Sequence, residues 1–243
     1  MKLLNCKIRR LITAPMLLLI VSVPIVAFAA GNNDNPVLSR IIIDHLEVHN
    51  SDSHSPLVLK GQGWIGQDLN KFWFKVETES EAGDIEEAEV QALYSRALTP
   101  YWDIQMGMRW DIEPSPTRGW AMIGLQGLAP YFFQVETALF VGESGDTAIR
   151  LEAEYELLFT QRLILSPQIE MNLYGQNNMD LGVGSGLSDL HAGLRLRYEI
   201  DRQLAPYIGM TWAKRFGNSA EFAHSAGEKT DELQLLLGIS AWF

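Results

Sequence analysis

The stretch Ile149-Arg150-Leu151-Glu152-Ala153-Glu154-Tyr155-Glu156-Leu157 alternates apolar and charged side chains without a break. Successive side chains of a β-strand point to opposite faces, so one face of this segment is apolar and the other is charged. Comparable segments recur along the chain after about the first thirty residues. The expected strands lie at residues 41–49, 56–65, 69–79, 86–97, 100–112, 118–128, 131–141, 147–159, 162–174, 188–199, 204–215 and 232–243.

The connections between these segments alternate between short and long. The short ones lie at residues 66–68, 98–99, 129–130, 160–161 and 200–203, and the others, mostly longer, are rich in Gly, Ser, Asn and Asp. Such sorting is typical of periplasmic turns and external loops, whereas a soluble β-sandwich gives no reason for it. We therefore predict an all-β fold, a transmembrane antiparallel up-and-down β-barrel of about 12 strands with lipid outside and water inside.

The N-terminal region has the pattern of a secretory signal peptide. Basic residues precede an apolar run over residues 11–28, and residues 27–29 (AFA) supply small side chains for cleavage. Two prolines interrupt the run, which disfavours a membrane-spanning helix. The expected organisation is a signal peptide at residues 1–29, a short periplasmic segment at 30–40 and an outer-membrane barrel at 41–243.

Charge and cysteine content narrow the chemistry of the mature chain. The formal net charge is -11, and removal of the signal peptide takes away four basic residues, which moves it to -15. Removal also takes Cys6, the only cysteine, so neither a disulfide nor a thiolate ligand is expected. The sequence has no Gly-rich phosphate loop and no basic patch, so neither nucleotide nor nucleic-acid partners are expected.

The charged face carries more carboxylates than basic groups. An acidic excess in a narrow lumen concentrates cations and rejects anions. The alternative is that these groups pair across strands and simply fill a small barrel.

Histidine gives the sharpest signal on the charged face. His45, Glu47 and His49 alternate in the first predicted strand, so all three project into the lumen. Two imidazoles and a carboxylate at this spacing suit Cu(II), Zn(II) or Ni(II). His191 also points inward, and the inward Met122 is a candidate soft ligand for Cu(I), with packing as its alternative role. These five residues are the candidate metal site.

Several strings together resemble the copper resistance protein B family, over residues 41–243. They are residues 44–47 (DHLE), 62–66 (QGWIG), 72–75 (FWFK), 184–189 (GSGLSD), 193–200 (GLRLRYEI) and 205–209 (APYIG). The resemblance implies an outer-membrane β-barrel of Gram-negative bacteria that serves copper tolerance, with periplasmic copper-binding or copper-oxidising proteins as partners. Family members often carry a Met- and His-rich segment before the barrel, but residues 31–40 contain neither residue type.

The expected function is to bind copper ions, to pass them across the outer membrane, or both, without enzymatic activity or a tightly bound cofactor. One alternative is a non-specific small porin or structural barrel in which the histidines are incidental. A less favoured alternative is an outer-membrane esterase or lipase. The stretch 182–186 (GVGSG) offers a serine among glycines but departs from G-x-S-x-G, and no group is available to orient a catalytic histidine.

Overall fold

The computed structural model describes residues 35–50, 55–179 and 181–243. The predicted signal peptide and the start of the predicted periplasmic segment lie outside the described residues. Residues 35–243 form one compact unit. Within the described ranges, no helix has both the length and the apolar character that crossing a membrane requires.

The elements follow one another as a series of antiparallel strands with one helix near the C-terminus. In chain order they are β1 (Leu38–Asn50), β2 (Leu57–Gly66), β3 (Asn70–Glu81), β4 (Asp84–Thr99), β5 (Trp102–Glu113), β6 (Arg118–Ala129), the 3₁₀ turn η1 (Pro130–Phe132), β7 (Phe133–Gly142), β8 (Thr147–Glu154), β9 (Leu157–Leu158), β10 (Leu163–Tyr174), β11 (Gly186–Tyr198), β12 (Leu204–Arg215), α1 (Gly217–Ala226) and β13 (Asp231–Trp242).

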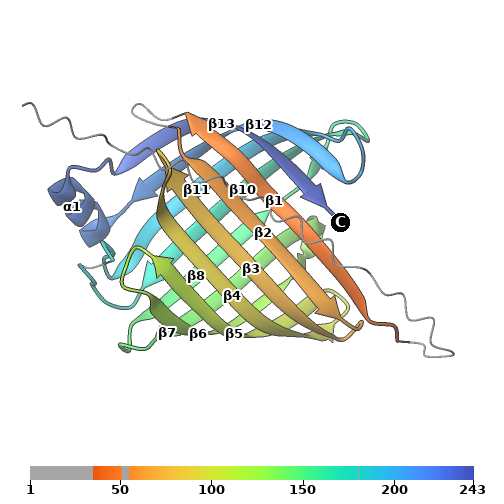
Figure 1. The fold of residues 1–243 in the computed structure, drawn as a ribbon, viewed down its shortest axis with the longest axis horizontal. Coiled ribbons are helices and arrows are strands. Elements are labelled where there is room, and N and C mark those ends of the chain that lie inside the picture. Colours follow the sequence, from red (N-terminus) through yellow and green to blue (C-terminus); the bar gives the residue numbers. More distant parts are fainter. Residues whose placement is uncertain (1–34, 51–54, 180) are drawn as a thin grey trace, which may run out of the picture. The chain divides into compact units, whose positions relative to one another are not determined.

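The sheet closes on itself. Neighbouring strands pair in chain order, β10 pairs with β11, and β13 pairs with β1 to complete the ring (Figure 1). At the closing seam the Ile41 amide donates to the Phe243 carbonyl at 3.0 Å, and the Phe243 amide donates to the Ile41 carbonyl at 2.8 Å. The two-residue β9 pairs with β10 directly beyond the end of β8, so β8 and β9 together form one strand of the ring. The ring therefore has twelve strands. The predicted closed antiparallel barrel is confirmed.

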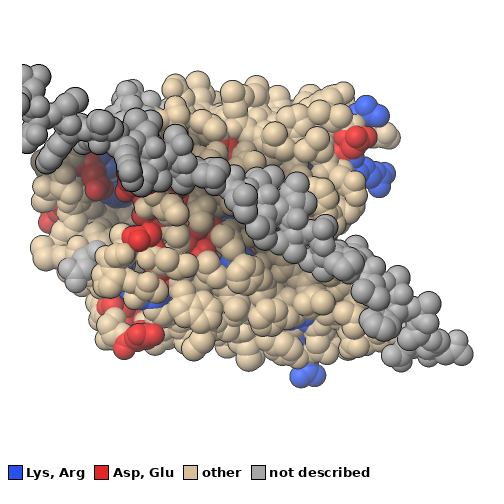
Figure 2. All heavy atoms as spheres, viewed as in Figure 1, with Lys and Arg blue, Asp and Glu red and all other residues tan. Residues whose placement is uncertain are grey.

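The two faces of the wall differ as the alternation predicts. On β3, Phe72 and Phe74 are about half exposed on the outside, while Lys75 lies in the interior and pairs with Glu136. On β13, Leu233, Leu235 and Leu237 are all more than half exposed on the outside. Most of the visible side wall in Figure 2 is uncharged, and the largest acidic patches lie toward the end that carries α1. An apolar outer band around a charged interior suits a barrel surrounded by lipid.

Helix α1 lies in a segment predicted as a loop, residues 216–231. It ends at Ala226 and is capped by Gly227, which has a left-handed backbone (φ 80°) and whose amide donates to the His224 carbonyl. The buried Ser219 hydroxyl accepts a hydrogen bond from the Gly184 amide at 2.7 Å and contacts the Ser188 hydroxyl at 2.8 Å. The helix is therefore fastened to β11 and the loop before it, contacts that no local sequence pattern reveals.

Candidate functional site in the barrel lumen

A β-bulge in β1 alters which side chains enter the lumen. Ile43 pairs with Gly61 of β2 and His45 pairs with Lys60, so Asp44 has no opposite residue on that strand. The register to β13 shifts at the same place. A bulge of this kind re-aims neighbouring side chains. As a result Asp44 and His45, although consecutive, both line the same lumen cavity.

Beyond the bulge, Glu47 lies at the centre of a hydrogen-bonded group that we call the Glu47 cluster: Glu47, His49, Arg195 and Tyr207. Arg195 binds the carboxylate in a bidentate manner, with Nη2 at 2.8 Å from Oε1 and Nε at 3.1 Å from Oε2. Tyr207 OH donates to Oε2 at 2.9 Å, and His49 Nε2 lies 3.0 Å from Oε1. These four bonds occupy the acceptor positions of one carboxylate, which is only 2% exposed.

Tyr207 reaches Glu47 across a strand. Its residue on β12 pairs with Gly238 of β13, and Gly238 in turn pairs with Glu47 of β1. A Cβ atom at position 238 would lie 2.5 Å from the phenol Oη and Cζ atoms. Because Gly238 has no side chain, the tyrosine ring can pass over β13 and reach Glu47 on β1.

The imidazoles on β1 are also engaged. His49 Nδ1 lies 2.7 Å from Gln234 Oε1, so both ring nitrogens of His49 have hydrogen-bond partners. His45 makes a longer contact, 3.4 Å from Nδ1 to Tyr207 OH, and the two rings meet edge to face. Of the three β1 residues predicted to bind metal, His45 is the one that lines the cavity, whereas Glu47 and His49 serve the cluster beside it.

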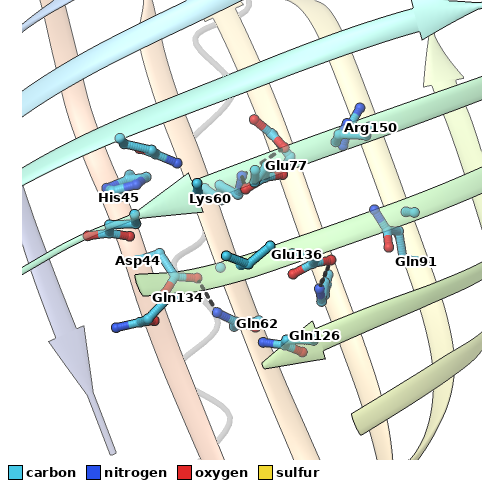
Figure 3. A pocket seen from close by; sticks show the side chains of 18 of the residues that line it. Asp44, His45, Lys60, Gln62, Glu77, Gln91, Gln126, Gln134, Glu136 and Arg150 are labelled. Atoms are coloured by element: carbon cyan, nitrogen blue, oxygen red, sulfur yellow. Dashed lines mark hydrogen bonds and ion pairs between the residues drawn. The ribbon is translucent and has the colours of Figure 1, made fainter. Parts of the chain in front are cut away.

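The cavity has a volume of about 390 Å³ and lies inside the ring. Figure 3 shows Asp44 and His45 on one part of its wall and Gln91 and Arg150 on another. Its charged lining consists of six carboxylates and four cationic groups: Asp44, Glu77, Glu89, Glu136, Glu152, Glu154, Lys60, Lys75, Arg150 and Arg197. The carboxylates outnumber the cations, as the sequence predicts for the lumen.

All four of these cations pair with carboxylates. Lys60 Nζ lies 3.1 Å from Glu152 Oε2, and Arg150 Nη2 lies 3.1 Å from Glu89 Oε2. Opposite charges paired across strands also meet the expectation that part of the charged face fills the barrel. Predicted charge excess and predicted pairing therefore occur together.

Met122 faces inward, as predicted, but lies in an apolar group. It is 5% exposed and belongs to a buried cluster with Leu93, Trp120 and Phe140. The Arg109 guanidinium lies 4.9 Å from the centre of the Phe140 ring, which adds a cation–π contact to the cluster. The surroundings of Met122 fit its alternative role in packing.

His191 lies apart from the other candidates. Its half-exposed side chain places Nε2 3.3 Å from Asp189 Oδ1 on the same strand, and it is not among the cavity-lining residues. In the part of the chain that the structure describes, no group of three or more His, Cys, Asp or Glu side chains is arranged to hold a metal ion. Metal binding by the five candidates stays a prediction.

Three residues of this region are absent from the sequence-based list of candidates: Asp44, Arg195 and Tyr207. Asp44 could be suspected, because the polar pair Asp44-His45 interrupts the alternation between Ile43 and Leu46. Arg195 and Tyr207 could not, because their contacts with Glu47 depend on strands that are distant in sequence and, for Tyr207, on the space left by Gly238.

A closed ring with an apolar exterior and a charged interior defines an outer-membrane β-barrel. Solved porins share this fold. The NanC porin aligns with a TM-score of 0.55 and 16% identity over 84% of this chain and 99% of its own. The KdgM porin gives 0.53 and 13% over 85% and 99%. At this identity the likeness concerns the fold alone.

Sequence comparison places the chain more narrowly. Residues 37–243 match the family model described as Copper resistance protein B precursor. "Copper resistance protein B" of Escherichia coli is 41% identical over 211 residues, which cover 87% of this chain and 71% of the relative. A "Copper resistance protein B homolog" of Pseudomonas syringae pv. tomato is 43% identical, with 87% and 72% covered. The chain belongs to the copper resistance protein B family, and the predicted resemblance and outer-membrane location are confirmed.

Proposed function

We propose that this barrel contributes to copper resistance by binding copper ions in its lumen and passing them across the outer membrane. The observation that carries the proposal is the placement of His45 and Asp44, through the β1 bulge, on the wall of an acid-rich cavity inside the closed ring. Imidazole nitrogen and carboxylate oxygen together suit Cu(II). Copper is the cargo here and not a resident cofactor.

The partners of the lumen side chains favour weak binding. Glu47 and His49 are held by other groups, and the carboxylates near the cavity are largely paired with Lys or Arg. Passage through a pore requires sites that attract an ion without trapping it. We therefore assign His45 and Asp44 the direct contact with copper, and Glu47 and His49 a supporting role.

The remaining candidates, His191 and Met122, have minor roles in this proposal. His191, half-exposed beside Asp189, is suited to a passing contact with the ion. Met122 would need its apolar cluster to rearrange before its sulfur could reach a metal. Periplasmic copper-binding or copper-oxidising proteins would deliver or collect the ion, and the proposed function involves no catalysis.

A non-specific small porin is the second candidate function. The paired charges of the lumen and the porin fold favour it. In that case small ions would pass without regard to their ligand chemistry, and the histidines would not affect the rate.

Copper flux into liposomes tests both candidates. The protein is used in its mature form, after removal of the signal peptide. The wild type is compared with the His45→Ala single variant and the His45→Ala/His49→Ala double variant. His224→Ala in α1 is the matched control. We expect both lumen variants to lower copper flux but not potassium flux, and the control to match the wild type. Equal copper flux in all proteins would favour the porin, and flux no higher than in protein-free liposomes would rule out passage.

A further inference from the structure

The cavity wall is rich in side-chain amides. Five glutamines line it, each from a different strand, and a sixth lies behind one of them. The lining residues are Gln62, Gln91, Gln126, Gln134 and Gln168, and Gln105 donates to Gln126 Oε1 at 2.7 Å. Four of them are labelled in Figure 3. Amides form hydrogen bonds but carry no net charge. They can therefore offer hydrogen-bond acceptors to an occupant of the cavity without needing a charged partner.

Gln91 presents an acceptor that has no partner. The residue is 6% exposed, and its Oε1 makes no hydrogen bond within the described chain. Its Nε2 donates to Glu89 Oε1 at 2.5 Å. Because a carboxylate in its ionised form only accepts hydrogen bonds, this contact fixes which end of the amide faces Glu89. The oxygen of Gln91 is therefore the end left without a partner.

Gln105 repeats the arrangement. It is 1% exposed, its amide nitrogen is used by Gln126, and its Oε1 is also unpartnered among the described residues. Buried acceptors without a donor are unfavourable, and they are rare in native proteins. Gln105 lies behind the lining, so the acceptor next to the cavity is that of Gln91. Together with the carboxylate excess, it calls for an occupant that carries many hydrogen-bond donors and positive charge.

A hydrated divalent cation meets this requirement. Each water bound to the metal turns its hydrogens outward, and the positive charge makes those hydrogens strong donors. Six waters occupy about 180 Å³ at their volume in the liquid, and the cavity holds about 390 Å³. The site therefore has room for an ion that keeps its hydration shell.

We propose that the part of the cavity around Gln91 binds a divalent cation in hydrated form, through hydrogen bonds from its waters to Gln91 and the neighbouring amide and carboxylate oxygens, at a position separate from the direct contact with His45 and Asp44 (Figure 3). This inference rests on the proposed passage of copper and specifies how the ion is held there. It makes Gln91 a specificity-determining residue: its Oε1, buried against the wall, turns toward the cavity to accept from the hydration shell and does not displace it. A site of this kind releases its ion readily, because no bond to the metal has to break.

Hexaamminecobalt(III) is the probe for this site. Its six ammonia ligands donate hydrogen bonds like bound water, but they do not exchange, so the complex cannot take protein ligands onto the metal. Binding is measured by calorimetry on the full chain in nanodiscs, together with inhibition of copper flux in liposomes. We expect the probe to bind and to inhibit flux in the wild type.

Substitutions then locate the binding. Gln91→Leu keeps the approximate size and removes the acceptor, and we expect it to weaken probe binding about tenfold. Gln134→Leu alters an exposed lining residue that is not needed for packing, and we expect a smaller loss. Gln203→Leu, in the exposed turn between β11 and β12, should match the wild type. Circular dichroism confirms that each variant is folded.

The outcomes separate this inference from the proposed function. Copper flux without any binding of the probe would overturn hydrated binding and leave copper passage standing. Probe binding that neither Gln91→Leu nor Gln134→Leu weakens would also overturn the inference. Probe binding that requires Gln91, in a protein that passes no copper, would support the hydrated site and reject the proposed passage.

Discussion

The Glu47 cluster and the glutamine-lined cavity lie in the same lumen but differ in how their acceptors are occupied. The Glu47 carboxylate has four hydrogen bonds from three side chains. The Gln91 and Gln105 amide oxygens have none within the described chain. A carboxylate beside two histidines is the better metal ligand by composition, but of these acceptors the Gln91 oxygen is the one beside the cavity that is left for an incoming ion. Occupancy, more than residue type, decides what a buried polar group can bind.

The two regions are also built from different strands of the barrel. The Glu47 cluster joins β1 to β11 and β12 and, through Gln234, to β13, so it lies across the closing seam. The glutamines come from strands on the other side of that seam, from β2 to β10. We interpret the cluster as the part that stabilises the ring and the cavity as the part that contacts cargo.

The largest expected effect comes from breaking the cluster. Arg195→Ala leaves the buried Glu47 carboxylate without its bidentate partner, and we expect a loss of about 3–5 kcal/mol in the free energy of unfolding. The measurement is urea unfolding in lipid vesicles, followed by tryptophan fluorescence. Arg215→Ala is the control, because its pair with Glu228 is exposed on both sides and should contribute about 0–1 kcal/mol. Equal losses in both variants would contradict a structural role for the cluster.

A smaller loss is expected from Tyr207→Phe. The change removes the hydroxyl that donates to Glu47 at 2.9 Å but keeps the ring above Gly238. A hydrogen bond to a charged group contributes about 1.5–3 kcal/mol. Tyr94→Phe removes an exposed hydroxyl that donates to Asn70 and should cost less than about 1 kcal/mol. A Tyr207→Phe protein as stable as wild type would show that Arg195 and His49 satisfy the carboxylate without the hydroxyl.

Releasing the carboxylate should turn the cluster into a metal site. In Arg195→Gln the guanidinium no longer occupies Glu47, so the carboxylate can join His45 and His49 around Cu(II). We expect the copper affinity of the folded protein to rise about tenfold, equivalent to about 1.4 kcal/mol, and copper flux to fall because the ion is retained. Quenching of tryptophan fluorescence by copper measures the affinity. Unchanged affinity would mean that these three side chains cannot converge on one ion.

The smallest expected effect on stability concerns a carboxylate outside the lumen, Asp146. It serves as a reference for the Glu47 cluster and the glutamine-lined cavity. Asp146, between β7 and β8, accepts hydrogen bonds from Ser144, Gln176 and Asn178. These bonds, chiefly the one from Ser144, lower the pKa of Asp146 below its ordinary value. A lowered pKa stabilises the fold above the ordinary value of about 3.9, and this contribution is lost as the pH falls further, through the folded-state pKa.

Hydrogen exchange checks this pH dependence. We expect the Gly142 and Gly145 amides, which are bonded in the Asp146 turn, to lose protection on acidification. In Asp146→Asn the same amides should exchange at a rate that reflects only the ordinary pH dependence of exchange. Identical acid responses in the two proteins would remove Asp146 as the cause.

Much of the fold could be predicted because membrane strands leave a strict period in the sequence. Phe72 and Phe74 had to face lipid if Lys75 faced water, and twelve repeats of this kind leave few alternatives to a closed ring. The same rule failed where the period is broken. Strict alternation misses Asp44, since the bulge brings two consecutive side chains into the lumen.

The candidate site was harder to predict because hydrogen-bond partners come from distant strands. The alternation correctly placed His45, Glu47 and His49 on one face, but nothing near them in sequence shows that Arg195 and Tyr207 already bind Glu47. The amide lining was equally hidden, since each strand contributes a single glutamine whose neighbours are ordinary. Pattern predicts which way a side chain points, and only the assembled ring shows what it meets.

The β1–β13 seam has a consequence for how the molecule is assembled. Its hydrogen bonds between Ile41 and Phe243 join the first and last strands, so they have the greatest sequence separation of any contact in the sheet. Such long-range pairing is slow to form. Until β13 arrives, both edge strands expose unpaired backbone groups that invite pairing with other chains. A newly exported chain therefore needs protection of these edges up to the moment its last strand docks.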